Sequence, residues 1–249
     1  MRFNPFPRLL ALLLSTLVLA ASARAAPGST CPADPPLPRL AMPHLRAALQ
    51  SDHEGLIVAL GSSSTEGAAA SGSGRTYPAV LQAELSAELP HWHVAVLNRG
   101  VGGQDVPEEL ARMEADVIAV RPQLVIWQVG ANAALHHADP ERFRAELLEG
   151  VQRLKQAGID VILMDNQRTP RILATTGDDA IDRALAQVAS EAGVNLFSRS
   201  RLMDAWASEG ASPAAFTAPD MLHHNDRGYL CLGRAFAHSL AASLLPPHA

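Results

Sequence analysis

The 249-residue chain has only two cysteines, no internal repeat and no apolar run as long as the ~20 residues that span a membrane. Basic residues are also scarce: 20 lysines and arginines stand against 25 aspartates and glutamates, and Arg2, Arg8 and Arg24 lie near the start. The negative net charge argues against nucleic acid or an anionic membrane surface as a partner. No second region of distinct composition follows, so the remainder of the chain fits a single domain.

The first 25 residues have the pattern of a secretory signal peptide. Arg2 and Arg8 precede a short apolar run at residues 9–21, and a small-x-small cleavage site ends at Ala25. We predict a signal peptide at residues 1–25, a proline-rich leader at 26–52 and one domain at 53–249. We therefore expect an exported protein, periplasmic or secreted, without stable membrane insertion after cleavage; an uncleaved membrane anchor is the alternative.

The two cysteines, Cys31 and Cys231, lie far apart in the sequence. An oxidising compartment would allow them to pair. The bridge would join the leader to the last predicted helix and close a very long loop, for which the entropic stabilisation is large. We predict this intramolecular disulfide, and two unpaired buried thiols are the alternative.

Short apolar runs alternate with amphipathic stretches of helical length. The apolar runs are rich in Val, Ile and Leu, as strands buried on both faces are, and fall at residues 56–60, 94–97, 124–128, 161–164 and 194–197. The amphipathic stretches fall at residues 77–89, 107–121, 140–156, 178–192 and 226–245. This alternation predicts an α/β fold in which a central parallel sheet of about five strands lies between two layers of helices.

Small and polar residues follow the predicted strands. Ser63 comes after the first strand, Gly103 after the second and Asn132 after the third. The carboxyl ends of parallel strands share one edge of the sheet, where binding crevices form. We therefore expect these residues to meet at that edge, together with Asp220 and His223 from the end of the chain.

Three of these residues could perform nucleophilic catalysis. Ser63 is a weak nucleophile that needs an adjacent base. His223 could accept its proton, and Asp220, three residues earlier, could fix the imidazole tautomer and stabilise the imidazolium. Alternatively, Ser63 only caps the following segment, and a backbone carbonyl orients the histidine. His224 is the rival base, and we favour His223 for its spacing from Asp220.

Attack on an ester carbonyl places negative charge on its oxygen, which preorganised N–H groups stabilise. The candidate donors are the backbone N–H groups of Ser63 and Gly103 and the side-chain amide of Asn132. Glycine at position 103 would allow the backbone to approach the substrate closely. A flexible glycine loop and an ordinary turn asparagine are the alternative interpretations.

The order of these segments resembles that of the SGNH (GDSL-like) hydrolase superfamily. Gly-Ser-Ser-Ser-Thr-Glu-Gly at residues 61–67 is similar to its first block, Asn-Arg-Gly-Val-Gly-Gly at 98–103 to the second, Gly-Ala-Asn at 130–132 to the third, and Asp-Met-Leu-His at 220–223 to the fifth. The resemblance implies a three-layer, flavodoxin-like α/β/α fold and serine esterase chemistry without a cofactor. It implies catalytic roles for Ser63, Asp220 and His223, with Ser63, Gly103 and Asn132 forming the oxyanion hole.

Three positions depart from the pattern of this superfamily. Ser62 replaces the usual Asp, His224 stands where Pro often follows the catalytic His, and Ala133 stands where Asp is frequent. The departures indicate a divergent member. The loss of the Asp is expected to change the hydrogen bonds behind the nucleophile rather than to remove catalysis.

The residues expected at the rim of the site are polar or aromatic: Trp127, Gln128, Asn166, Gln167, Arg168 and His224. This mixture favours a sugar, so we predict an exported esterase that hydrolyses small O-acyl esters, such as acetyl, on carbohydrate. The alternatives are a lipid esterase or lysophospholipase, an acyl-thioesterase, a glycan O-acyltransferase and a non-catalytic glycan-binding module. No metal site is expected, because His136 and His137 lack a nearby Cys or a Glu-x-x-His pattern.

Overall fold

The computed structural model describes residue 1 and residues 31–245, so the predicted signal peptide lies, Met1 apart, outside the described residues. The described strands form one parallel sheet in the order β2-β1-β3-β4-β5. Their bounds are Glu54–Gly61 for β1, His93–Gly100 for β2, Leu124–Gln128 for β3, Asp160–Met164 for β4 and Asn195–Phe197 for β5. The predicted parallel sheet of five strands is confirmed.

The carboxyl ends of four strands lie level with one another. Gly61 at the end of β1 pairs with Gly100 at the end of β2 and with Gln128 at the end of β3. Gln128 in turn pairs with Met164 at the end of β4. The loops that follow these strands therefore start from one edge of the sheet, as the sequence predicts.

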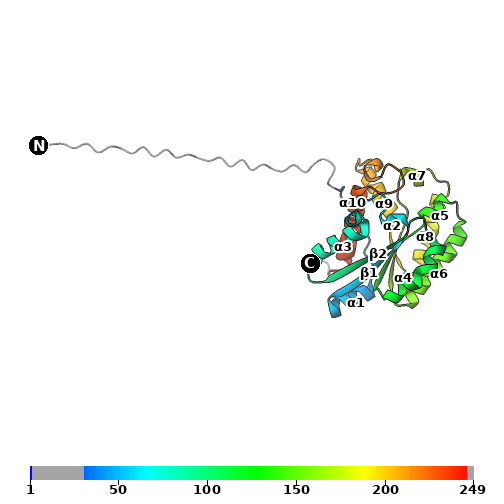
Figure 1. Ribbon diagram of the computed structural model, residues 1–249, viewed down its shortest axis with the longest axis horizontal. Helices are drawn as coiled ribbons and strands as arrows, with labels where there is room; N and C mark the ends of the chain where they lie inside the picture. Colours follow the sequence, from blue (N-terminus) through cyan, green and yellow to red (C-terminus); the bar gives the residue numbers. More distant parts are fainter. Residues whose placement is uncertain (2–30, 246–249) are drawn as a thin grey trace. The chain divides into compact units, whose positions relative to one another are not determined.

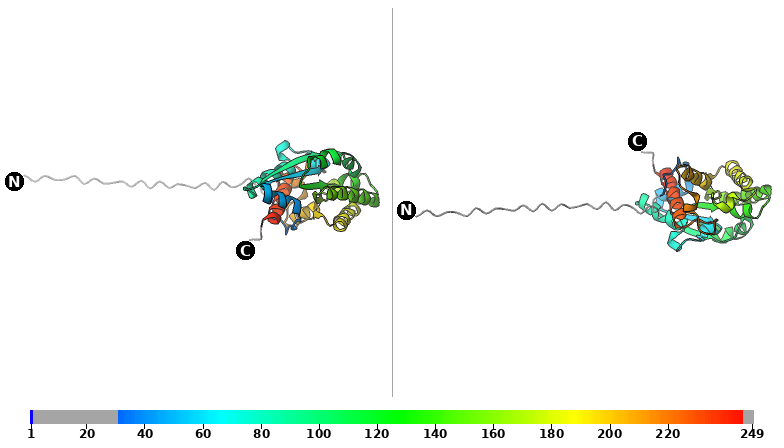
Figure 2. Two further views of the ribbon diagram at one scale, coloured as in Figure 1. Left: turned by 90° about the horizontal axis from the view of Figure 1, so that it is seen from below. Right: turned by 90° about the horizontal axis from the view of Figure 1, so that it is seen from above.

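Helices cover both faces of the sheet (Figure 1), and Figure 2 shows the same layers in two perpendicular views. Successive residues of β1 face opposite layers: Ile57 and Ala59 belong to one apolar core, and Val58 and Leu60 to the other. The first core includes α1 (Pro43–Asp52), α3 (Tyr77–Glu88), α9 (Arg199–Ser208) and α10 (Asp226–Leu244). The second includes α4 (Val106–Asp116), α6 (Pro140–Gln156) and α8 (Asp178–Ala192). The three-layer α/β/α fold is confirmed.

Local signals in the sequence set several helix ends. The Asp139 side chain accepts a hydrogen bond from the backbone N–H of Glu141 at 3.1 Å and caps α6. Both α6 and α8 have their predicted bounds, whereas α4 ends at Asp116 and a separate 3-10 turn, Ile118–Val120, follows. The helices that the sequence did not predict are α1, α9 and three short ones, α2 (Ser63–Glu66), α5 (Ala131–Leu135) and α7 (Pro170–Leu173).

Helix α1 belongs to the domain and not to a leader outside it. Its Leu45 and Leu49 are fully buried in the first core. The Asp160 carboxylate on β4 accepts a hydrogen bond from the Leu45 backbone N–H at 3.0 Å and lies 2.8 Å from His44 Nδ1. Helix α1, which precedes the predicted boundary at residue 53, therefore lies in the same compact unit as the residues that follow that boundary.

Cys31 and Cys231 form a disulfide, with their Cα atoms 5.3 Å apart. Cys231 lies in α10, so the bridge joins the start of the folded unit to its last helix across 200 positions of sequence. The predicted pairing is confirmed. Among residues 31–245, no helix is both long enough and apolar enough to cross a membrane.

Candidate active site

The candidate nucleophile lies at a tight turn from strand to helix. Directly after β1, Ser63 opens the short helix α2 (Ser63–Glu66). This helix packs against the end of β2, where a Cβ on Gly100 would lie 2.0 Å from the backbone nitrogen of Glu66. Only glycine fits such an approach of two backbones. The neighbouring strand therefore fixes the position of the turn.

Asp220 and His223 lie on the loop that leads into α10. Asp220 Oδ2 is 2.6 Å from His223 Nδ1, and His223 Nε2 is 2.7 Å from Ser63 Oγ. Asp220 Oδ1 accepts hydrogen bonds from the backbone N–H groups of Leu222 and His223, both at 2.9 Å. When Nδ1 carries its proton toward the carboxylate, Nε2 accepts the hydroxyl of Ser63. The predicted meeting of these side chains, across 160 positions of sequence, is confirmed.

The Asp220 carboxylate is stabilised in its ionised form. Burial raises the pKa of this carboxyl, but hydrogen bonds from the His223 ring and from two backbone N–H groups lower it by more. The pKa of Asp220 consequently lies below its usual range. An ionised carboxylate next to Nδ1 stabilises the imidazolium that forms when His223 accepts a proton.

Three candidate N–H donors lie at this edge of the sheet: Ser63 at the start of α2, Gly103 on the loop after β2 and Asn132 in the short helix α5. Gly103 adopts a left-handed backbone conformation with φ of 79°, which favours glycine. Among the described residues, no acceptor bonds the backbone N–H of Ser63 or Gly103. The side-chain amide of Asn132 donates one hydrogen to the Gln104 carbonyl at 2.6 Å, which leaves its second hydrogen for another acceptor.

The chain also matches a known family over nearly its whole described length. The model of the non-GDSL lipase-like family matches residues 28–245. The chain belongs to this family. The expectation of a divergent SGNH-type, ester-hydrolysing enzyme is thereby confirmed.

Two curated relatives and one solved structure give the degree of similarity. An acetylxylan esterase of Geobacillus stearothermophilus is 28% identical over 179 residues, which make up 66% of this chain and 80% of that protein. The crystal structure of Axe2, an acetylxylan esterase from the same organism, matches with a TM-score of 0.65 at 24% identity and covers 78% of this chain and 97% of its own. The uncharacterized lipoprotein YqeF of Bacillus subtilis (strain 168) is 30% identical over 115 residues, 43% of this chain and 46% of that protein.

In this member of the non-GDSL lipase-like family, Gln128 supports the nucleophile turn from behind. Its side-chain Oε1 accepts hydrogen bonds from the Ser62 backbone N–H at 3.3 Å, the Ser62 hydroxyl at 3.2 Å and the Thr65 hydroxyl at 3.1 Å. Ser62 therefore uses a hydroxyl donor where related enzymes usually have a carboxylate. Gln128 is fully buried, so its predicted place on the rim is wrong.

Replacing Gln128 with leucine should loosen this turn. Three donors would lose their acceptor, and each buried, unsatisfied group costs roughly 1–3 kcal/mol. We expect a lower melting temperature and a fall in kcat of about 10-fold, because a displaced Ser63 loses alignment with His223. The control is Gln128→Glu, which keeps the acceptor. Unchanged melting temperature and kcat in Gln128→Leu would exclude this support.

Two further rim candidates, Gln167 and His224, are buried behind the histidine loop. Gln167 is 1% exposed and donates through Nε2 to the Leu222 carbonyl at 3.1 Å, so it supports the histidine loop. His224 is fully buried, with Nδ1 3.1 Å from the Phe216 carbonyl. Burial lowers the pKa of His224 to about 3, so it stays neutral. Their predicted places on the rim are wrong.

Of the other candidates, Asn166 is also buried, and Arg168 is ion-paired with carboxylates of α8 and α9.

Trp127 was the last rim candidate, and this prediction is also wrong. Every residue of β3 is buried, and Trp127 points into the helix layer formed by α4, α6 and α8. Its Nε1 donates to Glu109 Oε2 at 2.6 Å. Burial raises the pKa of this buried Glu109 carboxyl to about 8, so it is mostly protonated at neutral pH.

Glu109 makes stability depend on pH. The pKa of Glu109 is about 8 in the folded protein and 4.5 ordinarily. The contribution of the protonated Glu109 to the free energy of unfolding is therefore fully present below about pH 4.5 and is lost as the pH rises through 8. The loss approaches about 1.4 kcal/mol per pH unit inside this window. In Glu109→Gln, the free energy of unfolding measured with urea should change less with pH between 4.5 and 8 than in the wild type. Glu114→Gln, an exposed change on the same helix, should keep the pH dependence of the wild type. Equal slopes in Glu109→Gln and the wild type would contradict this prediction.

Three exposed aliphatic side chains, which the sequence interpretation missed, lie on segments next to the proposed site residues. Within residues 31–245, the exposed large apolar side chains are Val101 (40% exposed), Leu173 (56%) and Met221 (54%), and we call these three the apolar lip. Val101 lies on the loop of Gly103, and Met221 follows Asp220. Leu173 ends α7, which is joined to the histidine loop by a hydrogen bond from the Arg171 N–H to the Met221 carbonyl at 3.0 Å. The sequence signal that could have indicated this is Met221, an apolar residue between Asp220 and His223.

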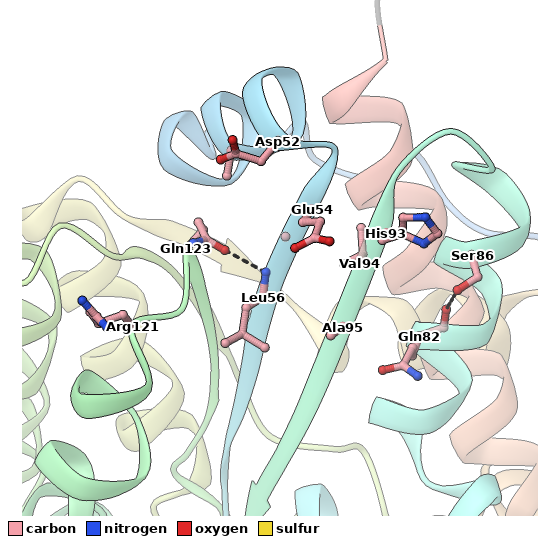
Figure 3. Close-up of a pocket in the computed structure, with 12 residues that line it drawn as sticks. Asp52, Glu54, Leu56, Gln82, Ser86, His93, Val94, Ala95, Arg121 and Gln123 are labelled. Atoms are coloured by element: carbon pink, nitrogen blue, oxygen red, sulfur yellow. Dashed lines mark hydrogen bonds between the residues drawn. The ribbon is translucent and has the colours of Figure 1, made fainter.

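A cavity of about 620 Å³ lies at the opposite, amino-terminal edge of the sheet (Figure 3). Asp52, Glu54 and His93 line it, and Gln123 Oε1 accepts the Leu56 backbone N–H at 2.7 Å. Because Ser63 follows the carboxyl end of β1 and Glu54 begins that strand, the cavity and the candidate nucleophile lie at different ends of the sheet. The cavity is therefore not the place of the proposed chemistry.

Proposed function

We propose that the protein is a serine esterase in which Ser63, His223 and Asp220 act as nucleophile, general base and orienting carboxylate. The observation that carries the proposal is the continuous hydrogen-bonded chain from Ser63 Oγ through the His223 ring to Asp220. A serine and a histidine of a merely structural site have no need of this alignment. The backbone N–H groups of Ser63 and Gly103 and the amide of Asn132 serve as the oxyanion donors.

The reaction proceeds in two halves through an acyl-enzyme. Ser63 Oγ attacks the ester carbonyl while His223 Nε2 takes its proton, and the carbonyl oxygen becomes a tetrahedral oxyanion. The intermediate collapses, the bond to the leaving oxygen breaks, and His223 returns the proton to the departing alcohol. Water then attacks the acyl-enzyme with His223 again as base, and release of the carboxylic acid regenerates the Ser63 hydroxyl.

The substrate we propose is a small O-acyl ester, such as acetyl, on carbohydrate. The support is the similarity to an acetylxylan esterase, both in sequence and in fold. The second candidate is an ester with a longer acyl chain, as in a lipid esterase or lysophospholipase. The apolar lip favours this candidate, because exposed aliphatic groups around a site gain free energy by covering a hydrocarbon chain.

We also propose that the protein is exported, to the periplasm or beyond the cell. The disulfide between Cys31 and Cys231 supports this location, because such bonds persist in oxidising compartments. The partial similarity to a lipoprotein supports it as well. Fractionation of expressing cells should recover the oxidised, mature chain outside the cytoplasm, and recovery of reduced full-length chain in the cytoplasm would contradict the proposal.

Active-site capture combined with a substrate series tests the enzymatic proposal. Incubation with phenylmethylsulfonyl fluoride should modify Ser63, as located by peptide mass, and should abolish turnover of p-nitrophenyl acetate in proportion. Acetate release from acetylated xylan, with slower turnover of p-nitrophenyl octanoate, is the result expected of a carbohydrate deacetylase. The reverse order would favour the longer acyl chain. Turnover that requires an added glycan acceptor would indicate an acyltransferase, and glycan retention without capture or turnover would indicate a binding module.

A further inference from the structure

Arg112 on α4 lies between the three segments that meet beside Ser63. Its guanidinium donates to the Gly61 carbonyl at the end of β1 at 3.1 Å and to the Arg99 carbonyl on β2 at 2.8 Å. The Nε–H donates to Gln104 Oε1 at 2.6 Å. The side chain is only 15% exposed, so these hydrogen bonds are largely shielded from competing water.

The glycine loop is held at two points: the Val101 backbone N–H donates to the Gly61 carbonyl at 3.0 Å, and Gln104 is anchored at the far end, after Gly103. Residues 101–103, which precede it, are all exposed, and a Cβ on Gly103 would meet nothing within 4 Å. Gly102 is packed more closely, since a Cβ there would lie 2.8 Å from Glu66 Oε2, so it is Gly103 that neighbouring atoms leave unconstrained. Gln104, which follows it, receives two anchors: Arg112 donates to its side chain, and Asn132 donates to its backbone carbonyl at 2.6 Å.

These contacts connect the segment before Ser63 with the residue after Gly103. The Gly61 carbonyl lies two residues before Ser63, and Gln104 directly follows Gly103. One rigid, planar guanidinium thus ties the nucleophile turn to the loop of a proposed oxyanion donor. We propose that Arg112 is a positioning residue that holds the Gly103 N–H at the correct place relative to Ser63. The inference rests on the proposed esterase function.

A purely structural role for Arg112 would look different. Its other contact is an ion pair with Asp116 at 3.0 Å, one turn along the same helix. Such i,i+4 pairs on partly exposed helix faces stabilise by only a few tenths of a kcal/mol. Asp116→Asn removes this pair and leaves every contact to the loops in place. It is therefore the matched control for helix stability.

The experiment compares Arg112→Met, Arg112→Lys, Gln104→Ala and Asp116→Asn. With p-nitrophenyl acetate, Arg112→Met and Gln104→Ala should each lower kcat by roughly 10- to 100-fold while KM changes by less than about 3-fold, because a misplaced donor weakens only the transition state. Arg112→Lys should recover part of the loss, since one ammonium replaces some of the donors. Asp116→Asn should retain the wild-type kcat.

A second readout does not depend on activity. Deuterium uptake at residues 101–105 should rise in Arg112→Met and Gln104→Ala, and should stay at the wild-type level in Asp116→Asn. Unchanged kcat together with unchanged uptake in Arg112→Met would overturn the inference, as would full activity in Gln104→Ala. Absence of Ser63-dependent hydrolysis in the wild type would contradict the proposed function alone, because uptake at the loop still decides whether Arg112 anchors it.

Discussion

Replacing His223 with alanine should lower kcat for p-nitrophenyl acetate by at least about 10², with a much smaller change in KM. Ser63 Oγ would lose the only base within 2.7 Å of it among the described residues, and a neutral hydroxyl is a poor nucleophile. The leaving alcohol would also lose its proton donor. The effect therefore falls on both halves of the reaction, which is why we expect it to be the largest effect on activity.

The matched control for this variant is His91→Ala, an exposed histidine on the loop that leads into β2. It should retain the wild-type kcat. Circular dichroism should show that His223→Ala remains folded, because this side chain lies at the surface of the site and outside both apolar cores. A folded His223→Ala protein with wild-type turnover would eliminate His223 as the base.

Loss of the disulfide should produce the largest effect on stability. The bond closes a loop of 200 positions, and the chain-entropy model gives an upper value of about 5 kcal/mol for such a loop. We expect Cys31→Ser to lower the free energy of unfolding by roughly 2–5 kcal/mol. Cys31 is the better position for the change, because Cys231 is fully buried and a hydroxyl there would add a desolvation cost.

Urea unfolding with and without reductant measures this effect. Reductant should destabilise the wild type by about as much as the Cys31→Ser substitution does, and should leave the Cys31→Ser variant unaffected. An unfolding midpoint in the wild type that does not respond to complete reduction would mean that the bridge constrains neither the folded nor the unfolded chain.

The strands and the long helices α3, α6, α8 and α10 could be predicted because their signals are local. The Val, Ile and Leu runs of β1, β3 and β4 are buried on both faces, and α6 begins at a proline after an aspartate cap. Helix α1 could not be predicted in this way, since it has 10 residues and only two buried leucines. Its stability comes from packing on the sheet, which the sequence of the segment alone does not display.

The meeting of Ser63, His223 and Asp220 could be predicted from order and spacing, whereas the rim could not. Position after a strand places a residue at the correct edge, but it does not say whether the side chain faces the substrate or the interior. Gln128 faces the back of the nucleophile turn, and Trp127, one residue earlier, faces the helix layer. Both are polar or aromatic residues at the predicted edge, and both are fully buried. Deciding such cases needs the packing of neighbouring elements.

The three residues of the apolar lip take no part in the proposed reaction. Leu173 ends a short helix of its own, and Met221 only separates the carboxylate from the imidazole in sequence. Substitutions at these places would change the size and polarity of the surface beside the proposed site and leave Ser63, His223 and Asp220 unchanged. Preference for one acyl group over another could therefore drift in evolution, or be redesigned, independently of the bond-breaking machinery.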